Sequence, residues 1–273
     1  MLKIFGHGSY IGDTGYNHHT RDFFRHLSSH AQIKFRNFTV GSSWSGMNSE
    51  PHNKEYYFNS TDRQILYEQV LWNNDGGRDN HKIYSNYSKE FVPDVNIVLC
   101  ETNHHLFYDE YNGPKIAYNV WESTLQPPHY FNKLKEFDEM WVPSKWQRDM
   151  TIAQGYDPNK IKVVPEGVDV KTFFPEKTSH KLTSDGRFKF FLAGRWDYRK
   201  SIKEIIETFL KTFDKDEPVD LIVSIDNPFS NDGLNTTEER LEHYGFTDDR
   251  IKVLHFPPRE DYIKILKSCD AFV

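Results

Sequence analysis

Cysteine, methionine and long apolar runs are scarce in this sequence of 273 residues. The two cysteines, Cys100 and Cys269, lie far apart, which favours two buried thiols over a disulfide framework. No apolar run approaches the length of a membrane span, and the first residues show no secretory signal pattern. The formal net charge is −6, so the chain lacks the basic excess of a general nucleic-acid binder. We therefore expect a cytoplasmic protein that binds no nucleic acid.

Several catalytic motifs are also missing. The sequence contains no Walker loop, no Gly-x-Ser-x-Gly motif and no spacing typical of zinc ligands. The turn from Asp214 to Asp216 mimics the Asp-x-Asp motif of metal-dependent transferases. It falls between an expected helix and the next strand, at the end of a sheet where ligands do not bind, so we interpret it as a solvated turn. We predict no metal and no cofactor.

What the sequence does contain is an alternation of short apolar segments with amphipathic helices, which is typical of a parallel α/β fold. Strands are expected over 2–5, 32–38, 95–100, 115–120, 139–142, 160–164, 188–193, 219–225 and 250–256. The polar stretch 169–186 contains a proline and predicts a domain boundary, with one domain over 1–175 and a second over 187–273.

A polar stretch over about 40–92 interrupts the first domain and carries scattered aromatic residues. Such a segment is either an acceptor-side insertion whose aromatics stack on sugar or a surface excursion, and the sequence leaves both readings open. Beyond it, Ser144 is predicted to cap a helix whose Trp146, Met150 and Ala153 face the interior. Further helices are expected over 202–213, 237–244 and 260–269.

The segment 188–213 joins a buried strand to an amphipathic helix through a basic turn. A glycine ends the apolar run, and Arg195, Arg199 and Lys200 follow before the helix begins. A helix N-terminus favours an anion, and Arg and Lys add charge and donors that suit phosphate oxygens. The turn therefore predicts a diphosphate site, although position alone does not distinguish it from a solvated basic turn.

The chain opens with a strand and a glycine-rich segment that leads into a helix near Asn17. This is the opening unit of a Rossmann-like domain. Ile11 stands where the dinucleotide fingerprint has its third glycine, which disfavours a dinucleotide-dependent dehydrogenase or epimerase.

Three segments together resemble one family. Residues 194–200 read Gly-Arg-Trp-Asp-Tyr-Arg-Lys, 141–146 read Trp-Val-Pro-Ser-Lys-Trp, and 163–169 read Val-Val-Pro-Glu-Gly-Val-Asp. They are similar to the G-R-x-x-x-R-K, V-P-S and V-P-x-G-V-D elements of retaining glycosyltransferases of the GT-B fold, in glycosyltransferase family 4 (glycosyl transferases group 1). The resemblance implies two Rossmann-like domains, an N-terminal one on the acceptor side and a C-terminal one that binds the nucleotide sugar.

The resemblance also implies a reaction and its residues. A retaining hexosyltransferase would move a sugar from a nucleotide-diphosphate sugar to a glycan, lipid or other acceptor, without a metal, and could associate peripherally with a membrane through its acceptor. Arg195 and Lys200 would be catalytic, stabilising the departing diphosphate. Donor binding is expected at Gly15, Tyr16, Arg195, Arg199 and Lys200. Trp121 and Glu122 are candidates for the sugar site, where many relatives carry a histidine.

The sequence departs from the family pattern in two places. Ser201 replaces the glycine that usually follows the lysine, and the sequence ends at Val273, before the family's paired glutamates in the E-x7-E element. We therefore expect a fragment of a longer protein or a truncated one, with the second domain incomplete. The alternative function is a non-catalytic nucleotide- or glycan-binding remnant of such an enzyme.

Overall fold

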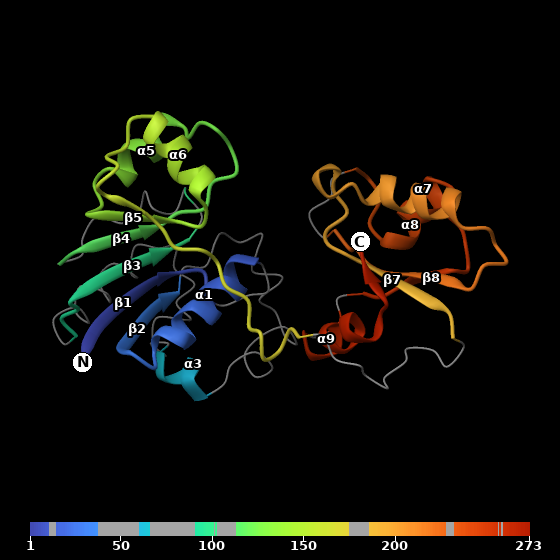
Figure 1. Ribbon diagram of the computed structural model, residues 1–273, viewed down its shortest axis with the longest axis horizontal. Helices are drawn as coiled ribbons and strands as arrows, with labels where there is room; N and C mark the ends of the chain where they lie inside the picture. Colours follow the sequence, from blue (N-terminus) through green and yellow to red (C-terminus); the bar gives the residue numbers. More distant parts are fainter. Residues whose placement is uncertain are drawn as a thin grey trace. The chain divides into compact units, whose positions relative to one another are not determined.

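The computed structural model describes residues 1–10, 15–37, 60–65, 91–100, 102, 113–174, 186–227, 232–255, 257 and 259–273. The chain divides into two compact units, Met1–Val168 and Asp169–Val273 (Figure 1). Each unit is built on its own sheet, and all the strand pairs in both sheets are parallel. The prediction of an α/β fold with two Rossmann-like domains is confirmed.

The first unit has a six-stranded sheet in the order β2-β1-β3-β4-β5-β6. The strands are β1 (Leu2–Gly8), β2 (Ala31–Asn37), β3 (Val95–Leu99), β4 (Lys115–Tyr118), β5 (Glu139–Val142) and β6 (Ile161–Val163). The order reverses between β1 and β3, where Gly8 ends β1. A Cβ at Gly8 would lie 1.7 Å from the carbonyl oxygen of Leu99, so only glycine allows the two strands to approach this closely.

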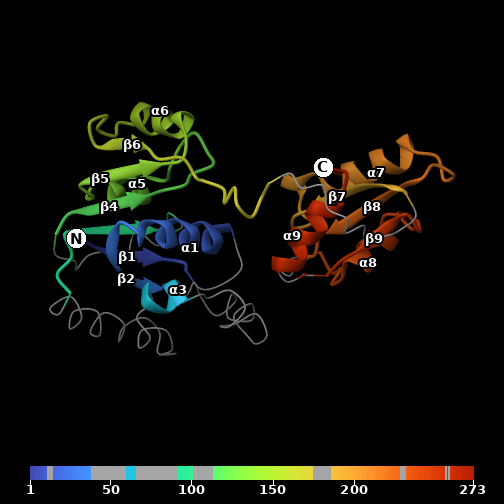
Figure 2. The same ribbon diagram turned by 60° about the horizontal axis from the view of Figure 1, so that its bottom comes forward.

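Helices cover both faces of this sheet, as both views show (Figures 1 and 2). On one face α1 (Gly15–Leu27) and α3 (Ser60–Ile65) enclose a core that includes Ile4, Phe24 and Phe35. On the other, α5 (Pro128–Leu134) and α6 (Lys145–Ala153) enclose a core that includes Phe5 and Leu134. Successive strand residues such as Ile4 and Phe5 point to opposite faces, so each contributes to a different core.

The second unit has a four-stranded sheet in the order β10-β7-β8-β9. Its strands are β7 (Phe188–Ala193), β8 (Val219–Ser224), β9 (Ile251–Val253) and β10 (Ala271–Phe272). The core on one face is shared by α7 (Ile202–Thr212) and α8 (Thr237–His243), and that on the other by α9 (Arg259–Ser268). The amphipathic spacing in 202–213 therefore predicted α7 and its buried face, with Ile202, Ile206 and Phe209 inside.

Helix α6 begins where expected but turns a different face inward. Ser144 is its N-cap, accepting a hydrogen bond from the backbone N–H of Gln147 at 3.1 Å. The prediction that Trp146, Met150 and Ala153 face the interior is wrong, because Trp146 is 47% exposed, Ala153 is exposed and Met150 is only partly buried. Gln147 and Thr151 are the residues of α6 that are buried. Helix α5 was not anticipated from the sequence.

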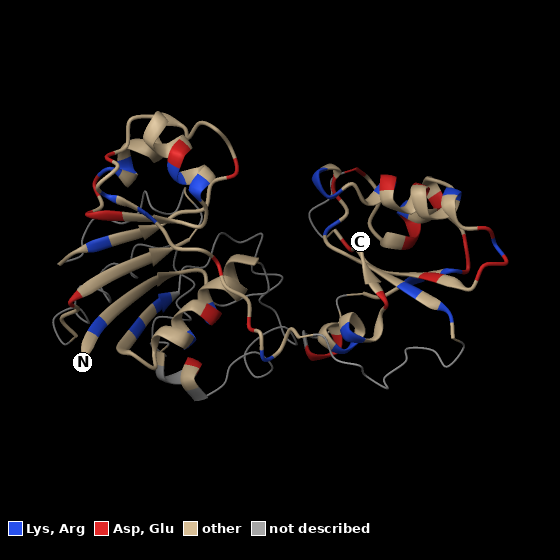
Figure 3. Ribbon diagram, in the orientation of Figure 1, with Lys and Arg blue, Asp and Glu red and all other residues tan. Residues whose placement is uncertain are grey.

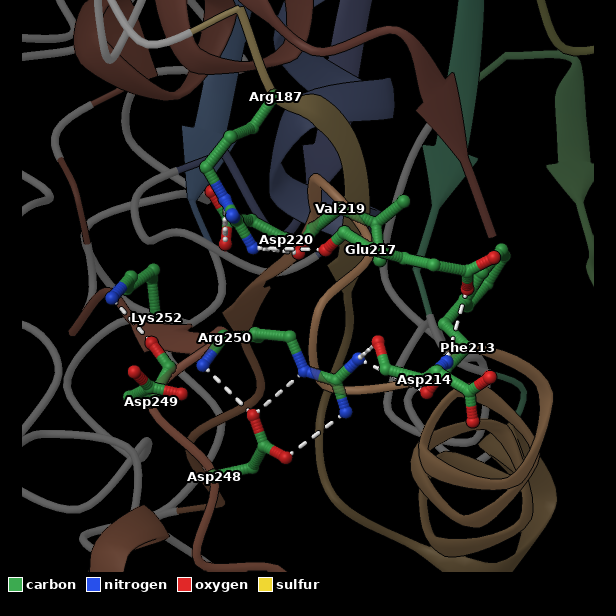
Figure 4. Close-up of polar contacts among 10 residues, drawn as sticks. All are labelled: Arg187, Phe213, Asp214, Glu217, Val219, Asp220, Asp248, Asp249, Arg250 and Lys252. Atoms are coloured by element: carbon green, nitrogen blue, oxygen red, sulfur yellow. Dashed lines mark hydrogen bonds and ion pairs between the residues drawn. The ribbon is translucent and has the colours of Figure 1, made fainter.

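Figure 4 shows the amino edge of the second sheet, where the turn from Asp214 to Asp216 lies. Arg250 is buried there and donates to both carboxylate oxygens of Asp248, at 2.9 and 3.0 Å. It also donates to the carbonyl oxygens of Phe213 and Asp214, so it closes the carboxyl end of α7. The pKa of Asp248 is lowered, chiefly by its hydrogen bond from Arg250. This edge of the sheet is thus held by structural ion pairs.

The polar stretch predicted over about 40–92 lies outside the described residues apart from α3 and residues 91–92, so the prediction of an insertion stays untested. Within the described part of the chain, no helix combines the length and apolar character needed to cross a membrane.

Candidate functional site

The strands of a parallel sheet all point one way, so the segments that follow them gather at one edge, where α/β proteins bind their ligands. In the second unit the turn 194–201 occupies this edge, between the end of β7 and the start of α7. It contains the short helix η3 (Tyr198–Lys200). The three basic residues predicted to bind a diphosphate, Arg195, Arg199 and Lys200, therefore share one turn.

Two side chains shape this turn. Gly194 has φ +141°, and the aliphatic stem of Lys200 folds against it, so that a Cβ at position 194 would lie 3.8 Å from Lys200 Cδ. Asp197 accepts hydrogen bonds from the backbone N–H of Lys200 at 3.1 Å and from Nε of Arg195 at 3.0 Å. Asp197 thus caps η3 and orients the Arg195 guanidinium, while Arg195 and Lys200 remain exposed to solvent.

Trp196 anchors the turn to the body of the unit. Its ring packs against the core under α7 and stacks on Tyr244, with ring centroids 5.9 Å apart. Its carbonyl oxygen accepts a hydrogen bond from the side chain of Asn227 at 2.7 Å. The cations on either side of Trp196 therefore project from a fixed backbone.

A second cluster lies at the same edge of this sheet and joins three elements. Nδ1 of His255, after β9, lies 3.0 Å from Asp226 Oδ1, after β8, and Nε2 lies 2.8 Å from Glu238 Oε1 on α8. Thr237 donates to Asp226 as well, at 2.6 Å. Because an ionised carboxylate can only accept, the two contacts form together only when both ring nitrogens carry a proton. The pKa of His255 is accordingly raised, first by its hydrogen bond to Asp226.

In the first unit the carboxyl edge holds an open cavity of about 470 Å³. Its lining comes from the start of α1, the segments after β3 and β4, and α5, and comprises Tyr16, Thr102, Val120, Trp121, Glu122, Ser123 and Tyr130. The rings of Trp121 and Tyr130 meet edge to face at 6.5 Å. Aromatic walls with a few hydroxyl and carboxylate groups are what a sugar ring requires, since its C–H faces are apolar and its rim is polar.

Glu166 links the segment 163–169 to α1 at this same edge. Its Oε1 lies 3.1 Å from Nδ1 of His19, and the contact lowers the pKa of Glu166. The His19 ring also packs edge-on against Tyr118 at 4.9 Å, and the Tyr118 hydroxyl donates to the Val164 carbonyl at 2.6 Å. These contacts fix the first turns of α1, which carry Tyr16, against the ends of β4 and β6.

The structure thus brings Tyr16, Trp121 and Glu122 together in one cavity, with Gly15 beside Tyr16 at the exposed start of α1 but not in the lining. Thr102 and Tyr130 were not anticipated. Thr102 comes soon after the end of β3, so the rule that ligands bind beyond strand ends could have suggested it. Tyr130 lies on α5, the helix that was not predicted from the sequence.

Metal-binding groups are absent from the part of the chain that the structure describes, where no three His, Cys, Asp or Glu side chains are placed to hold an ion. Acidic and basic residues are interspersed along both units (Figure 3).

No family model and no curated protein matches the sequence. Solved structures do match in fold. HepE of Anabaena in complex with UDP-glucose is similar over 100% of this chain and 73% of its own, with 16% identity and a TM-score of 0.66. Sucrose-phosphate synthase of Thermosynechococcus elongatus is similar over 100% and 75%, with 11% identity and a TM-score of 0.68. A candidate UDP-N-acetylglucosamine 2-epimerase of Listeria monocytogenes is similar over 99% and 73%, with 12% identity and a TM-score of 0.53. The likeness shows that this chain has the GT-B fold.

Proposed function

We propose that this protein is a glycosyltransferase that moves a hexosyl group from a nucleotide-diphosphate sugar to a glycan, lipid or other acceptor with retention of configuration. The observation that carries the proposal is the turn 194–201, where Asp197 holds Arg195 beside Lys200 at the start of α7. Two cations and a helix N-terminus match the two charges of a diphosphate. The bound sugar nucleotide reported for HepE supports the choice of donor class.

Each group has a role in this reaction. Arg195 and Lys200 bind the diphosphate and stabilise the charge that develops as it departs, with Arg199 adding to the local field. In the first unit, Trp121 and Tyr16 receive a sugar ring, and Glu122 accepts hydrogen bonds from its hydroxyls. No metal is needed in this proposal, because the two cations already oppose the charge of the leaving group.

The test is a comparison of Arg195→Ala and Lys200→Ala with wild type, using UDP-glucose as the donor probe. Loss of a charge-assisted contact to phosphate should weaken UDP-glucose affinity about 10- to 100-fold in calorimetry and lower turnover by about 100-fold or more. Lys211→Ala is the control, since Lys211 is exposed near the other end of α7. Near wild-type affinity in both variants would overturn the assignment.

The similarity to the candidate epimerase supports a second reaction on the same fold, epimerisation of a UDP-sugar. Product analysis separates the alternatives. A transferase releases free UDP and a glycoside, whose anomeric configuration by proton NMR also tests retention, whereas an epimerase returns a UDP-sugar with one inverted centre. A chain that binds UDP-glucose and turns over neither way would be a non-catalytic binding protein.

A further inference from the structure

The segment 119–126 joins β4 to α5 and carries the part of the cavity lining formed by Trp121, Glu122 and Ser123. It is neither a strand nor a helix, so its backbone N–H and C=O groups need hydrogen-bond partners outside regular secondary structure. Residues 122–125 are exposed. What holds the two ends of this segment therefore sets the shape of the cavity rim.

Gln147 holds the first end. Its Nε2 donates to the Asn119 carbonyl at 2.8 Å, and its Oε1 accepts from the backbone N–H of Trp121 at 3.1 Å. Gln147 is 2% exposed, although it lies in the first turn of α6. Its amide takes the place of a neighbouring strand just beyond the last β4–β5 contact, where the Asn119 N–H still donates to Trp141.

Gln154 holds the other end in the same way. Its Nε2 donates to the Gln126 carbonyl at 2.7 Å, and its Oε1 accepts from the Gln126 N–H at 2.9 Å. Gln147 and Gln154 are seven residues apart, about two helical turns, and so lie on one face of α6. Between the two anchors, Trp121 Nε1 donates to the Leu125 carbonyl at 3.1 Å and closes the segment on itself.

The use of Gln147 is notable because another role was open to it. Ser144 and Gln147 have the spacing of a capping box, in which the glutamine would reach back to the backbone N–H of Ser144. Ser144 does cap Gln147, but the Gln147 amide turns to the segment 119–121 instead. The side chain therefore serves the cavity rim and not the helix end.

We propose that Gln147 and Gln154 are positioning residues, a pair of amide clamps that fix the segment 119–126 and thereby the sugar-binding geometry of the cavity. The role in sugar binding rests on the proposed function. A primary amide is suited to it because one group donates and the other accepts, which neither a carboxylate nor an ammonium can do.

The decisive variant is Gln147→Glu, which keeps the size and shape of the side chain. An ionised carboxylate still accepts from the Trp121 N–H but cannot donate to the Asn119 carbonyl, whereas a protonated carboxyl does both. The Gln147 side-chain amide contacts the backbone of Asn119 and Trp121, and neither group is ionisable. On the same helix, Lys145 is exposed and Arg148 pairs with Asp149 at 3.2 Å. Burial should therefore raise the pKa of the new carboxyl.

Two measurements test the clamp, namely hydrogen exchange of the clamped backbone amides and affinity for UDP-glucose. At about pH 8 the ionised carboxylate faces the Asn119 carbonyl without a proton between them, and repulsion between the two oxygens should push the side chain away from the segment. The ligand-free Gln147→Glu variant should therefore show about tenfold less hydrogen-exchange protection at the Trp121 amide, and about tenfold weaker affinity for UDP-glucose. At about pH 5 the variant should recover toward wild type in both. Gln154→Glu should repeat the pattern at the Gln126 amide. The control is Gln32→Glu, the same change at an exposed position of β2.

Unchanged protection at about pH 8, or a loss that persists at about pH 5, would overturn the clamp. Lost protection with unchanged UDP-glucose affinity would overturn its role in sugar binding. If the wild-type protein binds no UDP-glucose, the proposed function fails, whereas the protection factors, measured without ligand, still decide whether the amides hold the segment.

Discussion

Ser201 has φ 51° and ψ 32°, in the left-handed region of backbone conformation, between η3 and α7. It is the non-glycine residue with positive φ among those the structure describes. A left-handed conformation costs an L-residue with a side chain about 1–2 kcal/mol, while glycine adopts it freely. This cost explains why glycine usually follows the lysine in the G-R-x-x-x-R-K element, where this chain has Ser201. The departure was visible in the sequence, but its cost follows only from the backbone angles.

Ser201→Gly should therefore stabilise the second unit by about 1 kcal/mol, because it relieves the left-handed strain and the serine side chain makes no capping bond to lose. Urea unfolding followed by circular dichroism measures the change. Ser268→Gly, at the end of the right-handed helix α9, is the control and should destabilise, because it frees the backbone and removes the hydrogen bond from the Ser268 hydroxyl to the Ile265 carbonyl. Destabilisation by Ser201→Gly would show that the strain is absent.

At the level of elements, the sequence located α6 and its cap but not its inner face. Trp146, Met150 and Ala153 are apolar and have helical spacing, so they were the expected inner face. The structure instead places Gln147 and Thr151 inside. Gln147 is buried because the neighbouring segment 119–126 offers backbone groups that need hydrogen bonds. The spacing of apolar residues predicts which helix face packs on an apolar core, but it cannot predict that a polar side chain is buried by hydrogen bonds to a neighbouring segment.

His255 ties together three elements of the second unit through Asp226 and Glu238, and this gives a pH dependence. The pKa of His255 is raised in the folded protein, so its stabilising contribution is complete below the unfolded value of about 6.5 and is lost as pH rises through the folded value. His255→Gln should therefore cost stability at about pH 6 and progressively less above it.

Urea unfolding of the wild type and of His255→Gln, at about pH 6 and at higher pH, checks the prediction. His243→Gln serves as the control, since His243 is an exposed histidine on α8. A difference between wild type and His255→Gln that stays constant with pH would contradict the role of the charged contact.

For the molecule as a whole, the sequence was sufficient to predict two parallel α/β units and the basic turn after β7. It was not sufficient to assemble the cavity of the first unit, where Tyr16, Thr102 and Tyr130 come from segments far apart in the chain. Strand pairing brings them together, and no local pattern in the sequence records which strands are neighbours.

Removal of divalent metal tests the chemistry of the whole protein. Since Arg195 and Lys200 supply the positive charge for the diphosphate in our proposal, dialysis against EDTA should leave UDP-glucose affinity within about twofold of its starting value. Calorimetry before and after dialysis measures it. A loss of about tenfold that Mg²⁺ restores would show that an ion shares the site.

The order of strands in the first sheet also has a consequence in time, during synthesis on the ribosome. Strand β1 lies between β2 and β3, yet roughly sixty residues separate β2 from β3, and at about 5–20 residues per second these take several seconds to emerge. Over that interval one edge of β1 has no strand to pair with, because β3 has not yet been synthesised. The apolar side chains of Ile4 and Phe5, on the two faces of β1, also lack the core residues that β3 contributes. We therefore expect chaperones to bind the nascent chain at this stage, and slower translation to lengthen the exposure.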